Sequence, residues 1–297
     1  MIINDTQVQT LIEALPYLRD FKDKTIVVKY GGNAMLNDQI KNKVLQDIVF
    51  LQCAGMRPVV VHGGGPEITA MLMQAGKKSE FVSGLRVTDA ESVGIAEMAL
   101  VGKINTDLVA RLNTLGGRAV GLNGKDANLV QAKKHLADVY ENGEVNLVDI
   151  GYVGNVEHVN TDLIEVLLAN GFIPVIAPTG VGSSGETYNI NADSVAGEIA
   201  GALKAEKLLV LTDVRGIYSD YRDESSFIST LTFEKAQELI IRGKIDGGMI
   251  PKVRACITAL SGGAKKTHII DGRAEHTILM EIFSDKGVGT EVVKELR

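Results

Sequence analysis

Cysteine is scarce in this sequence. Cys53 and Cys256 are the two that occur among its 297 residues, and they lie far apart in the chain. They form no C-x-x-C pair, so the sequence gives no sign of a zinc site, and we expect no metal centre made of protein side chains. So little cysteine is typical of a protein that works in a reducing compartment, which predicts a cytoplasmic location.

Long apolar runs are also absent. No run approaches the roughly 20 residues that a membrane-spanning helix needs. The first ten residues, MIINDTQVQT, have no basic stretch followed by an apolar one. We therefore expect neither a membrane segment nor a signal peptide.

Positive charge is not in excess. Lysine and arginine number 31 against 37 aspartate and glutamate residues, which gives a net charge of -6 and a pI of about 5.5. Nucleic-acid-binding proteins usually carry a basic patch or tail, and this chain has no block of basic residues. We expect no nucleic-acid partner, and any site for an anion must be local.

Several motifs of known enzyme classes are missing. The chain has no G-x-x-x-x-G-K-[ST], H-R-D or D-F-G, which excludes P-loop enzymes and protein kinases. The run His62-Gly63-Gly64-Gly65 could be the oxyanion loop of an α/β hydrolase, but the G-x-S-x-G elbow of that fold is absent. Residues 180–185, GVGSSG, match G-x-G-x-x-G, yet polar residues 186–188 follow in place of a helix start. We predict a flexible surface loop there, not a dinucleotide site.

The stretch from Thr25 to Met35, TIVVKYGGNAM, carries the first positive signal. Its β-branched run predicts a buried strand, which ends in Lys29 and the pair Gly31-Gly32. Glycines let the backbone approach a ligand with its N–H groups exposed, and a lysine supplies a point charge suited to phosphate. The alternative is a tight turn with a lysine that reaches out to solvent.

The same pattern recurs further along the chain. Residues 58–66, PVVVHGGGP, follow a predicted helix that Asn37 or Asp38 would cap, so the two strands should lie parallel with both glycine loops at one sheet edge. Residues 172–177 and 206–218 add two more strands. Residues 243–253 form a last glycine loop that leads Lys252 into a helix.

Five polar residues lie near these loops. Arg86, within SGLRVTD, has a planar fork suited to a carboxylate, although a lone arginine is also typical of a salt bridge at a rim. Thr88 can cap the helix that follows, to about residue 115. Asn189, Asn191 and Asp193 alternate, so an extended segment would put them on one face. Asp193 either caps the next helix or holds lysines in place.

The remaining segments are less specific. Residues 5–20 predict an amphipathic helix kinked at Pro16, which packs on its own domain or meets another subunit. Residues 118–160 predict a β-rich excursion with turns at residues 123–124, 142–143 and Gly151. His135 and His158 fall there among charges and are predicted to lie on the surface.

Eight motifs in order, spread over essentially the whole chain, resemble the amino acid kinase family. They are KYGGNAM, VVVHGGGP, SGLRVTD, LVGKIN, DIGYVG, YNINADS, LTDVRGI and GGMIPKV. The resemblance implies an open three-layer αβα sandwich around a mostly parallel sheet. It also implies an N-terminal lobe, residues 1–194, for the acyl acceptor and for oligomerisation, and a C-terminal lobe, residues 195–297, for the nucleotide.

The resemblance further implies a reaction and its site. ATP with Mg²⁺ would phosphorylate the side-chain carboxylate of N-acetyl-L-glutamate, the second step of arginine biosynthesis. The implied catalytic residues are Lys29, Lys252 and Asp193. The implied acceptor-binding residues are Gly64, Gly65, Arg86 and Asn189. The implied nucleotide-binding residues are Gly31, Gly32, Thr212, Asp213, Gly216, Tyr218, Gly248 and Met249. Two alternatives are a kinase of the same fold for another acid or phosphate, and a non-catalytic arginine or nucleotide sensor, which should have lost one of the catalytic residues.

Both ends of the chain resemble the hexameric, arginine-inhibited members of the family. The N-terminal helix would interlace dimers into a ring, and the inhibitor L-arginine would lie among Tyr17, Lys207, His268, Glu281 and Gly287. The alternative for His268 is a core histidine within a strand. Glu291 departs from the family pattern, which predicts an apolar residue there, and residues 219–226 fit no pattern of the family.

Overall fold

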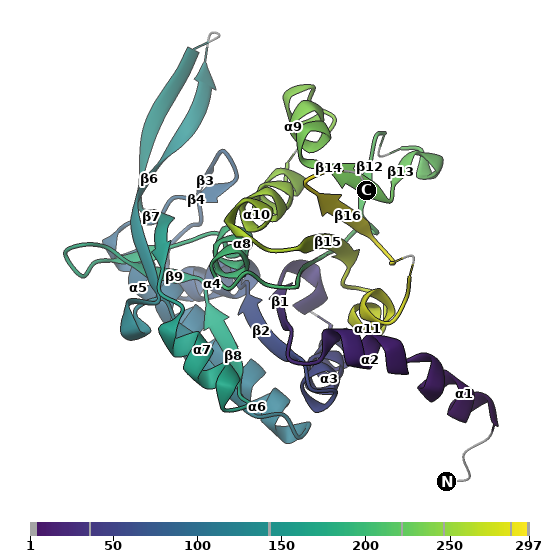
Figure 1. The fold of residues 1–297 in the computed structure, drawn as a ribbon. Helices are drawn as coiled ribbons and strands as arrows, with labels where there is room; N and C mark the ends of the chain where they lie inside the picture. Colours follow the sequence, from purple (N-terminus) through teal and green to yellow (C-terminus); the bar gives the residue numbers. More distant parts are fainter. Residues whose placement is uncertain are drawn as a thin grey trace.

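One large sheet organises the chain (Figure 1). The structure is a computed structural model that describes residues 5–35, 37–141, 144–220, 222–245, 247–285 and 287–295. Within these residues the sheet has eight strands, in the order β14-β16-β15-β11-β1-β2-β8-β5. In that order the strands are Thr230–Thr232, Thr290–Val293, Lys266–Asp271, Lys207–Thr212, Thr25–Tyr30, Arg57–His62, Ile173–Ala177 and Ala119–Asn123.

The central strand β1 brings Lys29 to the middle of the sheet. It runs parallel to both neighbours, with Lys29 opposite Val61 of β2 and Val210 of β11. Neighbouring strands are parallel throughout the sheet except for the antiparallel pair β15 and β16. The predicted parallel pair of glycine-loop strands is therefore confirmed, and both loops lie at the same edge.

Helices cover both faces of the sheet, because alternate β1 residues point to opposite sides. Ile26 and Val28 belong to one apolar cluster and Val27 to the other, and all three are fully buried. The first cluster includes residues of α3 (Asp38–Cys53), α4 (Gly65–Gln74), α5 (Ala90–Glu97), the π-helical segment η2 (Met98–Asn105), α6 (Thr106–Thr114) and α11 (Thr277–Ile282). The second includes residues of α7 (Asp162–Ala169), α8 (Ala192–Ala202), α9 (Phe233–Ile241) and α10 (Met249–Gly262). The predicted three-layer αβα sandwich is confirmed.

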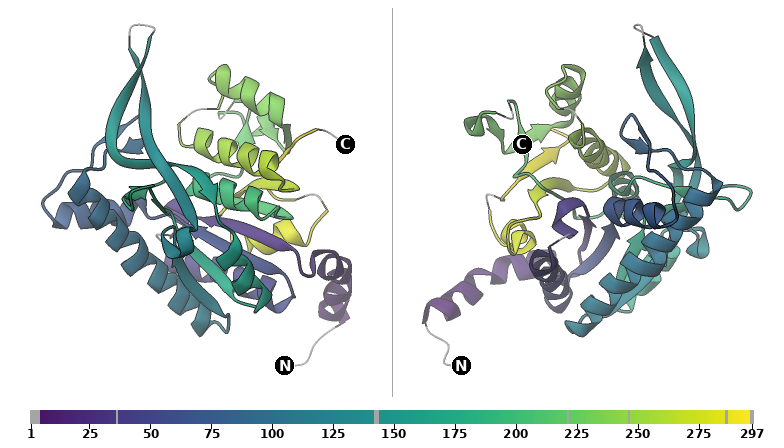
Figure 2. Two further views of the ribbon diagram at one scale, coloured as in Figure 1. Left: turned by 60° about the vertical axis from the view of Figure 1, so that its left-hand side comes forward. Right: turned by 180° about the vertical axis from the view of Figure 1, so that it is seen from behind.

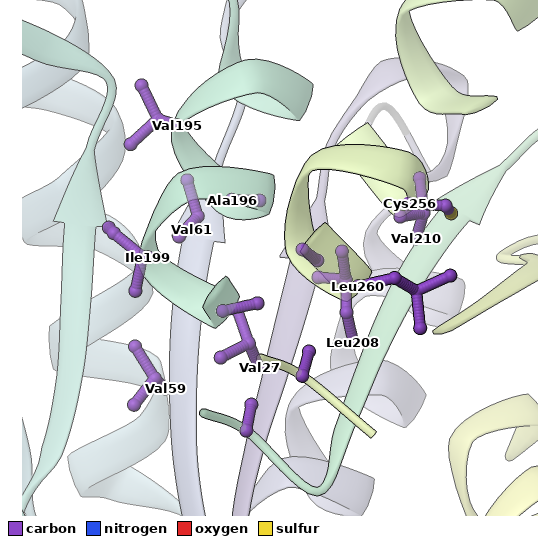
Figure 3. Packing of buried hydrophobic residues seen from close by; sticks show 14 of the residues in the cluster. Val27, Val59, Val61, Val195, Ala196, Ile199, Leu208, Val210, Cys256 and Leu260 are labelled. Atoms are coloured by element: carbon purple, nitrogen blue, oxygen red, sulfur yellow. The ribbon is translucent and has the colours of Figure 1, made fainter. Parts of the chain in front are cut away.

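Helices α8 and α10 lie side by side over β1, β2 and β11 (Figure 3). They touch through glycines: a Cβ built on Gly262 would lie 2.7 Å from the Cα of Gly201, and one on Gly197 would lie 2.6 Å from the carbonyl oxygen of Ala255. Any larger side chain at these glycines would push the helices apart. The close contact sets the spacing between the N-terminal ends of the two helices.

The predicted β-rich excursion forms a second, smaller sheet with a long hairpin that stands out from the body (Figures 1 and 2). Its strands are β6 (Val130–Glu141), β7 (Glu144–Val159), β9 (Thr179–Val181) and β10 (Thr187–Asn189). The predicted turn after Asn123 is confirmed, and that at residues 142–143 lies outside the described residues. Gly151 was expected in a turn, but it lies inside β7 with a φ of +85°, where a Cβ would collide with the carbonyl of Thr88.

Residues 180–185 join β9 to β10 and do not begin a helix. The predicted lack of a helix start after this segment is confirmed, although Gly180 and Val181 are paired strand and not free loop. Two short hairpins complete the strands, β3 (Phe81–Val82) with β4 (Leu85–Arg86) and β12 (Ile217–Tyr218) with β13 (Phe227–Ile228). The 3₁₀ turns are Gly32–Met35, Asp126–Asn128 and Glu224–Ser226.

Side-chain caps begin four of the described α-helices, namely α3, α5, α8 and α9. The Asn37 side chain accepts hydrogen bonds at the start of α3, as predicted. The prediction of Thr88 as a cap is wrong, because Asp89 caps α5 and Thr88 instead pairs with Gly151. Asn191 caps α8, so Asp193 lies in the first turn of that helix and its carboxylate is left for other partners.

The N-terminal helix is divided as Pro16 predicted. Helix α1 (Asp5–Glu13) ends before Ala14, and α2 (Leu15–Phe21) has Pro16 in its first turn. Helix α1 projects from the body (Figures 1 and 2). It and the start of α2 leave apolar side chains largely exposed, namely Val8, Leu11, Ile12 and Leu15. Across the described residues, no helix combines the length and apolar character that crossing a bilayer requires.

Candidate active site

Two lysines from distant parts of the chain meet at one aspartate. The Nζ atom of Lys29, in β1, lies 2.9 Å from one carboxylate oxygen of Asp193, in the first turn of α8. The Nζ atom of Lys252, in α10, lies 3.4 Å from the other oxygen. Lys252 also donates to the carbonyl of Gly248, 3.1 Å away. The structure thus brings together the three residues predicted to be catalytic.

This cluster is largely removed from solvent. Lys29 and Asp193 are 6% and 5% exposed. Burial alone would raise the pKa of Asp193, but the positive charges and hydrogen bonds of Lys29 and Lys252 hold it below its usual range. Asp193 is therefore an anion that orients two ammonium groups, and it is unsuited to act as a general base at neutral pH.

A cavity of about 440 Å³ opens on one side of the cluster. It is lined by Lys29, Lys252 and all eight residues predicted to bind nucleotide: Gly31, Gly32, Thr212, Asp213, Gly216, Tyr218, Gly248 and Met249. Lys244 and Ile245 also line it, and sequence reasoning did not select them. Their signal was present, since both belong to the glycine-loop stretch that precedes Lys252.

The first glycine loop, Gly31-Gly32, lines this cavity and packs closely against Lys29 and the neighbouring glycine loop. A Cβ on Gly31 would lie 3.1 Å from Nζ of Lys29 and 3.3 Å from the Cα of Gly63 in the neighbouring loop. Gly32 has a φ of +72°, which favours glycine. A side chain at either position would crowd the lysine or strain the turn, so these glycines keep backbone amides open toward the cavity.

A second cavity, of about 270 Å³, lies on the other side of the cluster. It is lined by Lys29, Asp193 and all four residues predicted to bind the acceptor: Gly64, Gly65, Arg86 and Asn189. Lys29 and Gly32 line both cavities. The two cavities therefore meet beside Lys29. This arrangement can hold two anionic molecules close together, because the positive charge of the lysine offsets their repulsion.

The guanidinium of Arg86 is held in place from several sides. It donates to the carbonyl oxygen of Gly65 at 3.0 Å, to Oγ1 of Thr69 at 2.8 Å and to the hydroxyl of Ser79, and it lies 4.7 Å from the ring centre of Phe81. Burial lowers its pKa from the usual value. Sequence reasoning missed these three side-chain partners, because only the folded hairpin β3–β4 and helix α4 place them around Arg86.

The described residues contain no group of three or more histidine, cysteine, aspartate or glutamate side chains that could hold a metal ion. Asp213 lines the larger cavity, and the side-chain hydroxyl of Thr212 lies 3.3 Å from its carboxylate. Mg²⁺ usually binds through one or two carboxylates together with substrate phosphates. The residues present fit an ion that arrives with a nucleotide.

The residues predicted to bind arginine gather around Glu281 on α11. Nζ of Lys207 lies 2.9 Å and Nε2 of His268 lies 3.0 Å from one carboxylate oxygen of Glu281, and the backbone N–H of Val288 donates to the other. Gly287 is so close that a Cβ would lie 2.8 Å from Glu281 Oε2. The alternative prediction, that His268 is a core residue, agrees with its burial, since it is 5% exposed. Its ring nevertheless contacts the carboxylate of Glu281.

Tyr17 lies at the edge of this group. Its hydroxyl donates to Asp285 at 2.7 Å, and its ring meets that of Phe283 edge-on at 6.0 Å between centres. Asp285 and Phe283 follow α11 directly in the chain. The structure therefore places all five predicted residues at or beside one end of α11.

Two further positions were open questions. Glu291 lies in β16, where its carboxylate is 3.1 Å from Nζ of Lys266 and 3.8 Å from Nε2 of His268, both on the neighbouring strand β15. Within residues 219–226, Tyr221 lies outside the described residues. The others lead from β12 through a 3₁₀ turn into β13, whose Phe227 packs on Tyr218 at the wall of the larger cavity. Of the histidines predicted on the surface, His158 is exposed and His135 is half-buried.

Comparison with known proteins gives consistent matches. The model of the amino acid kinase family matches residues 24–271. An acetylglutamate kinase from Moorella thermoacetica is 59% identical over 95% of this chain and 96% of its own length, and one from Pelotomaculum thermopropionicum is 56% identical over 96% and 97%.

Solved structures agree with these matches. N-acetylglutamate synthase from Neisseria gonorrhoeae, complexed with coenzyme A and N-acetyl-glutamate, is 27% identical, with a TM-score of 0.80 over 98% of this chain. The same synthase complexed with coenzyme A and L-arginine has a TM-score of 0.79 and is 26% identical. The chain spans 64% and 65% of the length of the synthase in these two structures.

Proposed function

Because this chain belongs to the amino acid kinase family and its curated relatives include acetylglutamate kinases, we propose that it transfers the γ-phosphoryl group of ATP to the side-chain carboxylate of N-acetyl-L-glutamate. The product would be an acyl phosphate, in the second step of arginine biosynthesis. The single observation that carries the proposal is the ion-paired cluster of Lys29, Asp193 and Lys252 where two cavities meet.

The chemistry of this cluster suits a carboxylate acceptor. A glutamate side chain has an unperturbed pKa of about 4.3, so it is already ionised at neutral pH and needs no general base. The obstacle is repulsion between this anion and the phosphates of ATP. Lys29 and Lys252 offset that repulsion, and the amides of Gly31 and Gly32 add donors for the charge that develops on the transferred group. Asp193 keeps both ammonium groups pointing at the junction.

We assign the larger cavity to ATP and the smaller one to the acceptor. Thr212, Asp213, Gly216, Tyr218, Gly248 and Met249 would surround the nucleotide. Mg²⁺, when bound with ATP, would neutralise phosphate charge, with Asp213 as the carboxylate nearest to it. This division corresponds to an acceptor lobe of residues 1–194 and a nucleotide lobe of residues 195–297, joined by the continuous sheet.

The acceptor site would recognise its ligand through Arg86, Asn189 and the amides of Gly64 and Gly65. Curated relatives at 59% and 56% identity named acetylglutamate kinase support N-acetyl-L-glutamate as that ligand. The second candidate, another amino acid or carboxylate, rests on the fold alone, and a non-catalytic sensor would not need all three charged residues of the cluster.

A hydroxamate assay for acyl phosphate tests this assignment. We expect purified enzyme with Mg²⁺ and ATP to give product with N-acetyl-L-glutamate and little with L-glutamate, L-aspartate or N-acetyl-L-aspartate. Equal turnover of a free amino acid would show that the acceptor is misassigned. No product with any member of the panel would leave the sensor as the better account.

We also propose feedback inhibition by L-arginine and a hexamer built as a trimer of dimers. Support comes from the basic and acidic side chains around Glu281 and from the exposed apolar face of α1, which resembles a helix that interlaces dimers. The complex of N-acetylglutamate synthase with L-arginine adds support from a structural neighbour. Both cysteines are unpaired, which supports a cytoplasmic location.

Deletion of residues 1–20 tests both regulatory proposals together. We expect the truncated enzyme to form dimers in multi-angle light scattering and to retain activity without inhibition by arginine. Intact hexamers after the deletion would refute the role of α1, and unchanged inhibition would refute the role of Tyr17.

A further inference from the structure

A buried histidine beside the acceptor cavity has no part in the chemistry proposed above. His62 is the last residue of β2 and is fully buried. Its Nδ1 atom lies 2.9 Å from the carbonyl oxygen of Gly63, and its Nε2 atom lies 3.1 Å from Nδ2 of Asn105. Burial lowers the pKa of His62 to about 4, so the ring is neutral at physiological pH.

The surroundings of Asn105 fix which ring nitrogen carries the proton. Its amide nitrogen also donates to the carbonyl of Val175 in β8, at 2.8 Å, and carbonyls can only accept. The side of Asn105 that faces His62 is therefore the NH₂ group, and Nε2 of His62 must be the acceptor. The proton of the neutral ring lies on Nδ1, where it is donated to the carbonyl of Gly63.

This bond sets the direction of the next peptide group. A trans peptide holds its C=O and N–H pointing in opposite directions. When the carbonyl of Gly63 points at the buried ring, the N–H of Gly64 points away from it, on the side where Gly64 lines the smaller cavity. The N–H of Gly63 is itself held by the carbonyl of Tyr30 at 2.7 Å, so the loop is fixed at both ends of Gly63.

The π-helical segment η2 packs against the same loop. A Cβ on Gly64 would lie 2.8 Å from Cδ2 of Leu100 and would collide with Ile104, both in this segment. Asn105 is its last residue. A π-helix holds more residues per turn than an α-helix, so it changes which side chains face the sheet, and such segments are frequent at functional sites. Here the segment turns Asn105 inward to His62.

We propose that Asn105 and His62 are positioning residues for the phosphoryl acceptor: together they fix the Gly63 peptide so that the N–H of Gly64 is presented to the acceptor carboxylate. The proposal rests on the function proposed above. Neither residue touches the ligand, and the LVGKIN motif that contains Asn105 thereby acquires a role at the acceptor cavity.

Four variants test the proposal by steady-state kinetics in which both substrates are varied. His62→Leu removes the donor to Gly63, whereas His62→Asn keeps an amide donor close to the place of Nδ1. Gly121→Ala reaches the network from β5, because its Cβ would collide with Oδ1 of Asn105. Gly94→Ala is the matched control, since no atom lies within 4 Å of the added Cβ.

We expect His62→Leu and Gly121→Ala to raise the KM for N-acetyl-L-glutamate about tenfold or more while the KM for ATP stays within twofold, because a misplaced donor loses its contact with the carboxylate. His62→Asn should recover most of the loss, and Gly94→Ala should match the wild type. Thermal melts identify the folded variants, and if His62→Leu does not fold, His62→Asn and Gly121→Ala decide. An unchanged acceptor KM, or equal rises in both KM values, would overturn the proposal. If the wild-type enzyme forms no acyl phosphate, the proposed function has failed, and not this inference from it.

Discussion

Two buried carboxylates in this chain are each held between two basic side chains, but their surroundings differ. Asp193 lies between Lys29 and Lys252; it lines the smaller cavity, and both lysines line the larger one. Glu281 lies between Lys207 and His268, and its second oxygen is taken by the N–H of Val288. The first cluster leaves cationic groups facing open space, and the second satisfies its charges internally.

The difference shows what each arrangement is suited to do. A buried ion pair contributes little net stability unless its geometry is good and its remaining lone pairs are satisfied, but removal of one partner is costly. Glu281 meets those conditions, so it ties α11 to the strands that carry Lys207 and His268. Asp193 pairs with two lysines that line the cavities, where the proposed ligands would accept their remaining hydrogen bonds. We therefore expect the charges at Asp193 to act on the proposed substrates, and those at Glu281 to stabilise the fold as well as to take part in the proposed binding of L-arginine.

The largest effect should come from Glu281→Gln. The substitution leaves Lys207, which is 7% exposed, without an anionic partner, and we expect a loss of about 3–5 kcal/mol in the free energy of unfolding. Urea denaturation followed by circular dichroism measures it. Glu238→Gln on the surface of α9, where the carboxylate pairs with Lys235, is the matched control and should cost far less. Equal losses of unfolding free energy for the two variants would show that Glu281 stabilises the fold no more than a surface ion pair does.

Lys252→Ala should lower the rate of catalysis and have little effect on the stability of the fold. Removal of one ammonium group from the junction is expected to lower kcat about 10²–10³-fold, the range for loss of one preorganised donor to a developing charge, with a much smaller change in either KM. Lys235→Ala, on the exposed side of α9, is the control. A normal kcat in Lys252→Ala would refute the role assigned to the open cluster.

Arg86→Ala separates acceptor binding from the transfer step. We expect mainly a higher KM for the acceptor, by a factor that corresponds to about 1.5–3 kcal/mol for a charged hydrogen bond. Arg118→Ala is a suitable control, because that arginine also lies over a ring, Phe172, but on the surface. A fall in kcat without a rise in KM would place Arg86 in the transition state and not in the binding of the acceptor.

The smallest effect is a pH dependence of the closed cluster. Burial alone would raise the pKa of Glu281, but His268 and Lys207 lower it to about 2 from an ordinary 4.5. Because the folded pKa is lower than the unfolded one, the stability that Glu281 supplies is complete above about pH 4.5 and is lost as the pH falls toward 2. The difference in unfolding free energy between wild type and Glu281→Gln should therefore shrink from pH 5 to pH 3. A constant difference would show that the carboxylate is not held as described.

The sequence predicted the frame of the site well, because that frame depends on local patterns. Strands that end in Lys29 or in His62 followed by glycines are recognisable from β-branched runs, and parallel strands necessarily bring such loops to one edge. The meeting of Lys29 with Lys252 needed more, since 222 intervening residues separate them. The family resemblance supplied that step, and the structure shows the contact through Asp193.

The details that the sequence did not predict depend on competition between neighbours. Thr88 and Asp89 are both good helix caps, and the pairing of Thr88 with Gly151 decides between them. Asn191 and Asp193 compete in the same way at α8. The π-helical segment was also missed, because its apolar spacing resembles that of an ordinary helix over so few turns. The partner of His62 depends on that segment and was therefore invisible as well.

The narrow boundary between the two cavities has a consequence for substrate range. Among the described residues, Lys29 and Gly32 are the ones that line both, while Arg86, Gly65 and Phe81 line the smaller cavity only. Under the proposed assignment of the two cavities, we expect redesign of the hairpin that carries Arg86 to change which acid is accepted without disturbing the phosphoryl donor. The preference for an acceptor and the use of ATP should therefore be separable by engineering, because different side chains line the two cavities.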